Sequence, residues 1–476
     1  MKRIVSLAFA TTVITTAVGF SARHSFSIPE KSFSLEGNKE APENYKNYCA
    51  GCHGNNLEEF VDRKWVYGSN ADQIGQIITK GIESEGMPGF GASLSLDEVK
   101  ALSEYILAEG KKQSIQKIAT QYTENSIYGT EVKYKIEKIV TGLEIPWGLE
   151  FLPNGDLLIA ERNGTLSRFT SDKKLIKIEG LPEIRVAGQG GLLDIKMHPD
   201  YAKNGFIYIA YSYYGDAEKN TGNTAIIRTK LKDNNLTDIT PIYKGTPAVK
   251  ASHHYGCKLE FDRANRLYFS IGDRGNHDVF PQTLNNSNGK IHRLNDDGTV
   301  PADNPFVSTE NAEPSVYSYG HRNSQGIAMH PVTGEIWESE HGPRGGDEIN
   351  LLKKGKNYGW PVISFGINYN GTILTPDTAN TGMEQPITYY IPSIAPCGMT
   401  FLTGNKYKGW ENSLLIGSLR FEYLERCVIE NHKVVKHERL LEGIGRVRNV
   451  KVSPDGYIYV GVENPGRILK LIPVDE

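Results

Sequence analysis

Residues 149–160 read Leu-Glu-Phe-Leu-Pro-Asn-Gly-Asp-Leu-Leu-Ile-Ala, which is an apolar run, a turn and a second apolar run. Two such runs joined by turn residues are typical of a β-hairpin. The pattern returns at residues 450–461 as Val-Lys-Val-Ser-Pro-Asp-Gly-Tyr-Ile-Tyr-Val-Gly. Looser copies begin at Leu193, Leu259, Ile327 and Met399. Six copies spaced by roughly 45 to 70 residues are typical of propeller blades rather than of a sandwich. We therefore predict a mostly β fold, a six-bladed β-propeller over residues 132–476.

The composition agrees with this fold and limits the partners. The 476 residues include 49 glycines, which favour turns over long helices. The formal net charge is −3 and 23% of the residues are charged. The chain therefore has neither the basic surface of a nucleic-acid-binding protein nor a polyanionic tail, and we expect no nucleic-acid partner.

A separate signal precedes the propeller, where residues 49–53 read Cys-Ala-Gly-Cys-His. Cys49 and Cys52 can each form a thioether with a haem vinyl group, and His53 can bind the iron, so the motif predicts covalently attached haem c. The alternatives are a disulfide, half of a zinc site or a thioredoxin-like redox pair. A zinc site needs a second pair of ligands, whereas the other cysteines are distant singletons: Cys257, Cys397 and Cys427. Haem is therefore the favoured interpretation.

Met87 is the candidate for the second axial ligand of the haem iron. It lies in a polar loop with no helical face to pack on, and thioether ligation raises the reduction potential of a haem. The alternative is a buried methionine that fills a gap. Residues 95–98 (Ser-Leu-Asp-Glu) predict a capping box that starts an amphipathic helix ending at Leu107. We expect this helix to close a small all-α cytochrome c domain over residues 38–112.

Two further segments complete the predicted organisation. Residues 113–131 are polar and lack a period, which is typical of a linker. At the other end, Lys2 and Arg3 precede an apolar run and small residues, so residues 1–22 predict a secretory signal peptide, with an uncleaved anchor as the alternative. Because haem c is attached in the exported compartment, we expect a periplasmic or secreted protein. No long apolar run follows, so we expect no membrane span after signal removal.

Propellers gather one set of loops around the mouth of a central channel, so polar residues that a turn does not need become candidate site residues. Four regions carry such residues: 188–191, 253–256, 320–323 with 340–348, and 445–448. His253 and His254, on an extended segment, are expected to point to opposite sides, so that only one faces the channel. Arg446 and Arg448 are expected on the same side of a strand. Three arginines, an imidazole and exposed carbonyls would suit a polyanion beside a general base.

These motifs, in this order, resemble those of the soluble pyrroloquinoline quinone (PQQ) dependent sugar dehydrogenases, which include the aldose sugar dehydrogenases. The resemblance spans about residues 140–473. It depends on eight segments: Pro146-Trp-Gly148, Gly188-Gln-Gly-Gly-Leu192, Gly272-Asp273, Gly320-His-Arg-Asn323, Asp347-Glu-Ile-Asn350, Asn357-Tyr-Gly-Trp-Pro361, Pro392-Ser-Ile-Ala-Pro396 and Ser453-Pro-Asp-Gly456.

The resemblance implies catalytic and cofactor-binding roles. His254 would be the general base that takes the proton from the anomeric hydroxyl of an aldose as a hydride leaves for PQQ. Gln189 and Asp273 would orient the sugar and the base. The residues implied to hold PQQ are Asn323, Arg322, Arg420, Arg446 and Arg448. Relatives carry a lysine at the position of Arg420, so the charge is kept but the donor geometry changes.

The resemblance also implies calcium. The carbonyl oxygens of Gly342 and Pro343 would bind a calcium ion that touches PQQ and acts as a Lewis acid. A second, more structural calcium is implied near Asp347, Glu348 and Tyr358. The glucose-specialised members have an aromatic platform where this chain has Tyr390-Ile391, and an amide where it has Asp278. Both departures favour a more open sugar site over glucose selectivity.

Cys257 and Cys397 both lie on loops that should approach the channel. Two arrangements are open at this point. In an oxidising compartment the two residues would pair and leave Cys427 free, or all three would stay buried and unpaired.

Together the two parts predict a quinohaemoprotein. The propeller would oxidise an aldose to a lactone, and electrons would pass singly to the haem of the same chain and then to a downstream acceptor such as a respiratory cytochrome. One alternative is a non-catalytic sugar-binding propeller with a tethered cytochrome; the presence of His254 with Gln189, Arg446 and Arg448 argues against it. Another is a calcium-dependent lactonase, which needs more carboxylates on the rim and leaves the haem unexplained.

Overall fold

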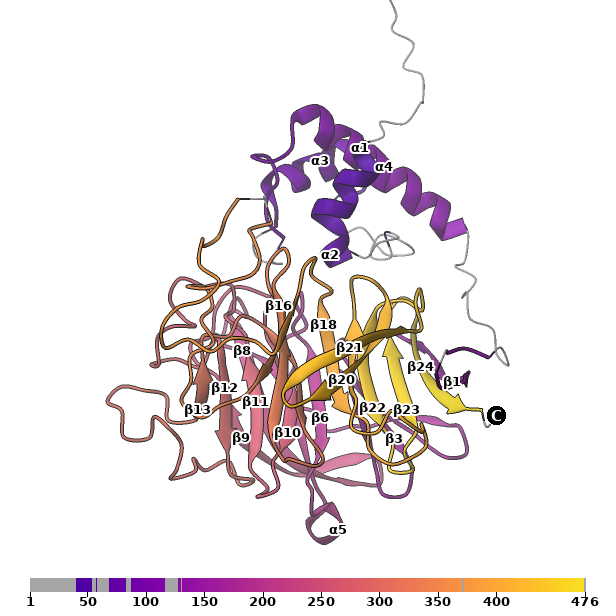
Figure 1. Cartoon of the computed structure of the whole chain (residues 1–476), viewed down its shortest axis with the longest axis vertical. Coiled ribbons are helices and arrows are strands. Elements are labelled where there is room, and N and C mark those ends of the chain that lie inside the picture. Colours follow the sequence, from indigo (N-terminus) through magenta and orange to yellow (C-terminus); the bar gives the residue numbers. More distant parts are fainter. Residues whose placement is uncertain are drawn as a thin grey trace, which may run out of the picture. The chain divides into compact units, whose positions relative to one another are not determined.

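The computed structural model describes residues 40–53, 57, 68–82, 87–115, 127–129, 131–369 and 372–474. The predicted signal peptide (residues 1–22) and most of the predicted linker (residues 113–131) lie outside these residues. A helical part and a β part follow one another along the described chain (Figure 1). Within the described residues, no helix combines the length and the apolar character that a membrane crossing requires.

The β part is a propeller of six four-stranded antiparallel sheets, which confirms the predicted fold (Figure 1). The first blade consists of β2 (Pro146–Phe151), β3 (Leu157–Glu161), β4 (Thr165–Phe169) and β5 (Leu175–Lys177). The second consists of β6 (Leu192–Met197), β7 (Phe206–Tyr214), β8 (Gly222–Lys232) and β9 (Asn235–Lys244), with the short helix α5 (Tyr201–Asn204) between β6 and β7. The third consists of β10 (Leu259–Phe261), β11 (Leu267–Ile271), β12 (Lys290–Leu294) and β13 (Val316–Tyr319).

The remaining three blades repeat this order. The fourth consists of β14 (Ser324–Met329), β15 (Ile336–Glu340), β16 (Asp347–Leu351) and β17 (Thr388–Tyr390). The fifth consists of β18 (Pro396–Phe401), β19 (Leu414–Ser418), β20 (Tyr423–Glu430) and β21 (Lys433–Leu440). The sixth consists of β22 (Val447–Val452), β23 (Ile458–Val462), β24 (Gly466–Pro473) and β1 (Tyr134–Leu143).

The sixth blade closes the ring. Its outer strand is β1, the first strand of the propeller, which pairs antiparallel with β24, the last. Hydrogen bonds between the two ends of the β part therefore hold the first and last blades together, which leaves no gap in the ring.

Each predicted hairpin forms the first two strands of one blade. In the first blade, Leu149 pairs with Ile159 across a turn in which Gly155 has a φ of 86°, a conformation that glycine adopts without steric cost. Both strands are buried along their whole length. Strands covered on both faces need no polar alternation, which explains why the repeat reads as two apolar runs.

The helical part contains α1 (Glu40–Asn44), the π-helical turn η1 (Tyr45–Cys49), α2 (Ala50–His53), α3 (Ala71–Lys80) and α4 (Leu96–Ile115). The predicted capping box is present, because Ser95 N donates to Glu98 Oε2 (2.8 Å) and Glu98 N donates to Ser95 Oγ (3.3 Å). The helix continues to Ile115 rather than ending at Leu107. The extra residues include Ala, Glu, Lys and Gln, which are good helix formers, and the single Gly110 among them does not end the helix.

Candidate active site

A histidine and a buried carboxylate face each other in the third blade. His254 precedes β10 and Asp273 follows β11, and His254 Nδ1 lies 2.7 Å from Asp273 Oδ1. The second carboxylate oxygen, Oδ2, accepts from Trp360 Nε1 at 2.9 Å. Burial alone would raise the pKa of Asp273, but His254, Arg322 and the hydrogen bonds lower it well below its usual range. Asp273 is therefore an anion that fixes the His254 ring.

His254 itself is held in its neutral form. Burial lowers the pKa of its imidazole, and the opposing effect of Asp273 is smaller. With Nδ1 against a carboxylate, the proton of the neutral ring belongs on Nδ1, and Nε2 keeps its lone pair. A neutral, oriented imidazole with a free lone pair has the chemistry of a general base.

The backbone of His254 differs from the sequence expectation. Its φ is 55°, in the left-handed region, so the segment is not extended. As a result the rings of His253 and His254 do not point to opposite sides but pack edge to face, with centroids 4.6 Å apart. Gln189 Oε1 accepts from His254 N at 2.8 Å and so holds this turn. The structure therefore places Gln189 against the backbone of His254.

Two arginines of the sixth blade share one carboxylate. Arg446 Nε donates to Glu463 Oε2 at 3.0 Å, and Arg448 Nε donates to Glu463 Oε1. Burial alone would raise the pKa of Glu463, but the two guanidinium groups lower it to about 2. Arg448 also donates to Gln325 Oε1 (2.9 Å) and lies over the ring of Trp147. Two fixed cations against one anion leave a net positive charge that suits an anionic ligand.

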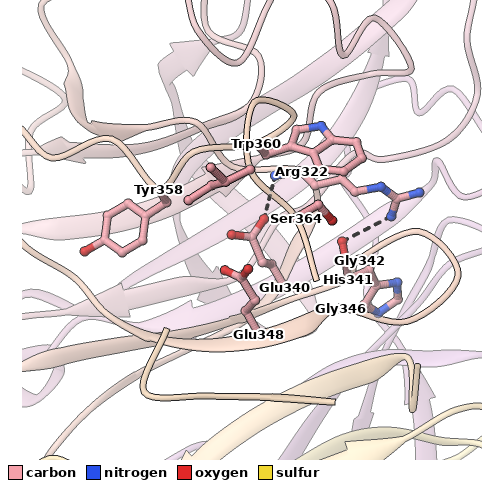
Figure 2. A pocket seen from close by; sticks show the side chains of 10 residues that line it. Arg322, Glu340, His341, Gly342, Gly346, Glu348, Tyr358, Trp360 and Ser364 are labelled. Carbon is pink, nitrogen blue, oxygen red and sulfur yellow. Dashed lines mark hydrogen bonds between the residues drawn. The ribbon is translucent and has the colours of Figure 1, made fainter. Parts of the chain in front are cut away.

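Arg322 and Asn323, at the start of the fourth blade, carry unused hydrogen-bond donors. Arg322 Nη1 donates to the carbonyl of His341 at 3.1 Å, and the guanidinium lies over the Trp360 ring (Figure 2). Asn323 is fully buried, and its Oδ1 accepts from Gly256 N at 3.1 Å. Arg322 Nε and Asn323 Nδ2 are buried without a hydrogen-bond partner among the described residues. Such donors fit a ligand rich in acceptor oxygens.

The loop of Gly342 and Pro343, which follows β15, is a tight turn stabilised by Asp347. A Cβ at Gly342 would lie 2.3 Å from the carbonyl oxygen of Gly345, so only glycine fits. Gly342 N donates to Asp347 Oδ1 at 2.9 Å. Crowded backbone carbonyls of this kind suit a hard cation such as calcium.

The three residues predicted for a second calcium are not equivalent. The Asp347 carboxylate accepts hydrogen bonds from Gly342 N, Ser393 Oγ, Ile394 N and Ala395 N. It therefore joins two loops, and its oxygens are engaged there. Glu348, the next residue of β16, lines a pocket together with Tyr358, and Gly342 and Gly346 of the loop line the same pocket. The hydroxyl of Tyr358 donates to the carbonyl of Leu351 at 2.6 Å and points away from Glu348 (Figure 2).

That pocket encloses about 260 Å³, part of it open to solvent (Figure 2). The residues that line it are Arg322, Glu340, His341, Gly342, Gly346, Glu348, Tyr358, Trp360, Ile363 and Ser364. Burial and the neighbouring Glu340 carboxylate raise the pKa of Glu348 well above its usual range. Two carboxylates in one buried space favour a cation.

The remaining predicted residues are placed as follows. Arg420 Nη1 donates to the carbonyl of Ser393 at 3.3 Å. In the helical part, Cys49 is a core residue and Met87 packs partly buried against the same apolar cluster. Met87 also forms an antiparallel bridge with Ile82. His53 ends α2, and the side chain of Cys52 lies outside the described residues.

The cysteines of the propeller decide between the two arrangements left open by the sequence. Cys257, Cys397 and Cys427 are all buried and unpaired, which is the second of the two arrangements. Cys257 packs in an apolar core, and Cys397 Sγ lies 3.0 Å from Arg448 Nη1. Cys257 therefore contacts apolar side chains, whereas Cys397 contacts a guanidinium group.

Sequence reasoning missed two residues of this site. Glu463 stands in no motif, and only the pairing of β22 with β23 brings it between Arg446 and Arg448. Trp360 lies in one of the quoted motifs, but no role was predicted for it. In the structure its indole donates a hydrogen bond to Asp273, and the guanidinium of Arg322 lies over its ring. A buried acid opposite two arginines is a signal only once the strand register is known.

Comparison with known proteins supports both parts of the chain. The sequence model described as Glucose / Sorbosone dehydrogenase matches residues 143–470, and the model described as Cytochrome C oxidase, cbb3-type, subunit III matches residues 37–106. The chain is 37% identical to aldose sugar dehydrogenase YliI of Escherichia coli over 357 residues, 73% of this chain and 95% of that protein. It is 29% identical to quinoprotein glucose dehydrogenase B of Acinetobacter calcoaceticus over 416 residues, 70% of this chain and 86% of that protein.

Solved structures show the same similarity. The soluble aldose sugar dehydrogenase of Escherichia coli in its apo-form aligns with a TM-score of 0.69 at 37% identity, over 72% of this chain and all of that one. The PQQ-bound form of an aldose sugar dehydrogenase from Streptomyces coelicolor aligns with a TM-score of 0.60 at 26% identity, over 73% of this chain and all of that one.

Proposed function

Because this chain belongs to the glucose/sorbosone dehydrogenase family and carries a cytochrome c domain before the propeller, we propose that it oxidises aldose sugars to lactones with PQQ and calcium and passes the electrons to its own haem c. The observation that carries this proposal is the contact of His254 with Asp273, a neutral imidazole held by a buried anion.

His254 is the proposed general base. Its Nε2 lone pair takes the proton from the anomeric hydroxyl of the aldose, and the imidazolium that forms is stabilised by the Asp273 carboxylate at Nδ1. Trp360 and Gly275 hold Asp273 by donating to its two oxygens, so the ring keeps its orientation. Gln189 fixes the backbone from which the ring projects.

The binding site proposed for PQQ is made by donors from three blades. Arg446 and Arg448 supply positive charge, and Arg322 and Asn323 supply donors, two of which have no partner among the described residues. Arg420 is the further proposed contact. When bound, PQQ supplies a quinone that accepts the two electrons and the hydrogen of the aldose as a hydride.

The calcium ion at the quinone is proposed to bind the carbonyl oxygens of Gly342 and Pro343. Asp347 orients that loop through the amide of Gly342. The second, structural calcium is proposed for the pocket of Glu348 and Tyr358, where Glu340 adds a carboxylate. Asp347 contributes to the second site only by holding the neighbouring loop.

The cytochrome domain is the proposed exit for electrons. Cys49 and Cys52 would hold the haem, and His53 and Met87 would bind its iron. Haem c supplies one-electron transfer, so a downstream carrier such as a respiratory cytochrome is the proposed partner. The signal sequence and the haem motif together support export to the periplasm or beyond.

Product analysis tests the catalytic proposal. The full chain is incubated with PQQ, calcium, an artificial electron acceptor and a panel of aldoses, and the products are identified by mass spectrometry. We expect aldonolactones that hydrolyse to aldonic acids. Absence of any oxidised product with every sugar, although PQQ binds, would contradict the proposal.

A further inference from the structure

Three side chains with metal-binding chemistry meet on the outer half of the fifth blade, on β20 and β21 (Figure 1). Glu425 and Cys427 lie two positions apart on β20 and therefore share one face of the strand. His437 lies on β21 directly opposite Cys427 in the strand register. The register thus brings a carboxylate, a thiol and an imidazole together, on other strands than those that carry the proposed cofactor site.

The three groups are close enough to share one ion. Cys427 Sγ lies 3.7 Å from His437 Nδ1 and 4.0 Å from Glu425 Oε1, and Glu425 Oε1 lies 2.5 Å from His437 Nδ1. Ligands of a tetrahedral zinc ion, at about 2.0 to 2.3 Å from the metal, are themselves about 3.3 to 3.7 Å apart. The two distances to sulfur already approach this spacing. The third is shorter because the imidazole and the carboxylate share a hydrogen bond.

The Glu425 carboxylate has one oxygen that can still bind a cation. Glu425 is 3% exposed, and its second oxygen, Oε2, is buried without a hydrogen-bond partner among the described residues. Its cross-strand neighbour Arg439 places its guanidinium over the ring of Tyr423 and beside Glu442. A buried carboxylate oxygen with no donor of its own is a ready ligand for a cation.

The site can be reached from solvent. The His437 side chain is 42% exposed, whereas Cys427 is fully buried. A substrate could not reach the sulfur, which argues against a cysteine nucleophile activated by His437. A small ion can enter beside the imidazole. Tyr390, whose hydroxyl lies 3.8 Å from Cys427 Sγ, is placed to donate to a metal-bound thiolate.

We propose that Glu425, Cys427 and His437 bind a zinc ion, with water as the fourth ligand. Thiolate, imidazole and carboxylate together suit zinc rather than calcium or magnesium, which prefer oxygen ligands only. On binding, the thiol proton of Cys427 passes to solvent and the Nδ1 proton of the neutral imidazole moves to Nε2, so one proton is released per ion. The zinc joins the exposed outer strand β21 to β20.

The test uses the full chain with haem attached. The protein is equilibrated at pH 8 with calcium-loaded EDTA, which removes zinc while calcium stays supplied. It is then desalted into chelator-free calcium buffer and titrated with zinc sulfate by calorimetry in two buffers of different ionisation enthalpy. Metal content is measured after desalting, and zinc-edge X-ray absorption identifies the ligands. We expect one zinc per chain, one released proton and one sulfur ligand.

Three variants make the test specific. His437→Asn removes an exposed ligand and leaves the core intact, and Cys427→Ser removes the sulfur. Both are expected to weaken zinc binding by more than about 100-fold, since loss of even an outer partner of a metal ligand costs 10- to 100-fold. His432→Asn changes a histidine of the same hairpin, at a φ of 59° that asparagine tolerates, and is expected to bind zinc like the unmodified chain.

Circular dichroism and aldose oxidation check that each variant is folded, and both are expected to be unchanged in His437→Asn. Equal zinc binding by His437→Asn and the unmodified chain would overturn the proposal, as would a zinc environment without sulfur. Failure of aldose oxidation in all samples would instead count against the proposed function and leave the zinc measurement valid.

Discussion

His254 Nδ1 lies 2.7 Å from Oδ1 of Asp273, a carboxylate that is 1% exposed. The contact gives the imidazole one orientation and one tautomer. The roles of the two residues can therefore be separated by experiment, because His254 would accept the proton and Asp273 would only orient the His254 ring.

Replacing His254 by alanine removes the proposed base and leaves the arginines in place. General bases contribute about 10² to 10⁴ in rate, so we expect kcat for aldose oxidation to fall by at least about 100-fold. PQQ affinity, measured by fluorescence titration, should change little. Full activity in the variant would show that another residue is the general base, with the neighbouring His253 as the next candidate.

Replacing Asp273 by asparagine tests positioning through the pH profile. Asp273 opposes the lowering of the His254 pKa by burial, so loss of its charge should lower that pKa further. The acidic limb of the kcat profile should then move to lower pH, while kcat on the plateau falls because the amide no longer fixes the tautomer. An acidic limb that stays in place, or moves to higher pH, would contradict this account.

Buried histidines should make the propeller sensitive to acid. Burial lowers the pKa of His253 to about 3 and that of His292 to about 4. Each binds a proton more readily when unfolded, so their contribution to stability is present above about pH 6.5 and is lost as the pH falls toward the folded pKa values. Each of these two histidines therefore adds about 1.4 kcal/mol per pH unit to the slope below pH 6. Urea unfolding between pH 7 and pH 5 measures the slope, and His253→Asn should lower it by about 1.4 kcal/mol per pH unit.

The Glu463 carboxylate balances part of the positive charge of two buried arginines, Arg446 and Arg448. Glu463→Gln leaves both guanidinium groups without their carboxylate, and breaking such a buried pair costs about 3 kcal/mol of unfolding free energy. An anionic cofactor restores part of the balance, so PQQ should raise the melting temperature of the variant more than that of the unmodified chain. Equal shifts would show that PQQ does not bind beside these arginines.

The sequence was sufficient for the blades because their inner strands are largely buried and therefore keep the same apolar hairpin, completely so at residues 149–160 and with partly buried positions at residues 450–461. It was insufficient for His253 and His254. The expectation of opposite sides assumed extended backbone, whereas a positive φ at His254, held by Gln189, brings the rings together.

The sequence was also insufficient to predict contacts between segments that are distant along the chain. Glu463 contacts Arg446 and Arg448 only through the pairing of β22 with β23. The Asp347 carboxylate, in turn, accepts hydrogen bonds from the amides of residues 394 and 395, which are distant in the sequence. The local sequence around Asp347-Glu348 indicates two acids on opposite faces of a strand, but it does not show which groups lie against each face.

The central claim is that electrons from an aldose reach the haem through PQQ in the propeller. The most direct measurement is the visible spectrum of the haem in the full chain, supplied with calcium under anaerobic conditions, before and after addition of aldoses. With PQQ present, we predict haem reduction by at least one aldose, and without PQQ we predict none. Reduction in the absence of PQQ, or no reduction in its presence across a broad panel of sugars, would contradict the account.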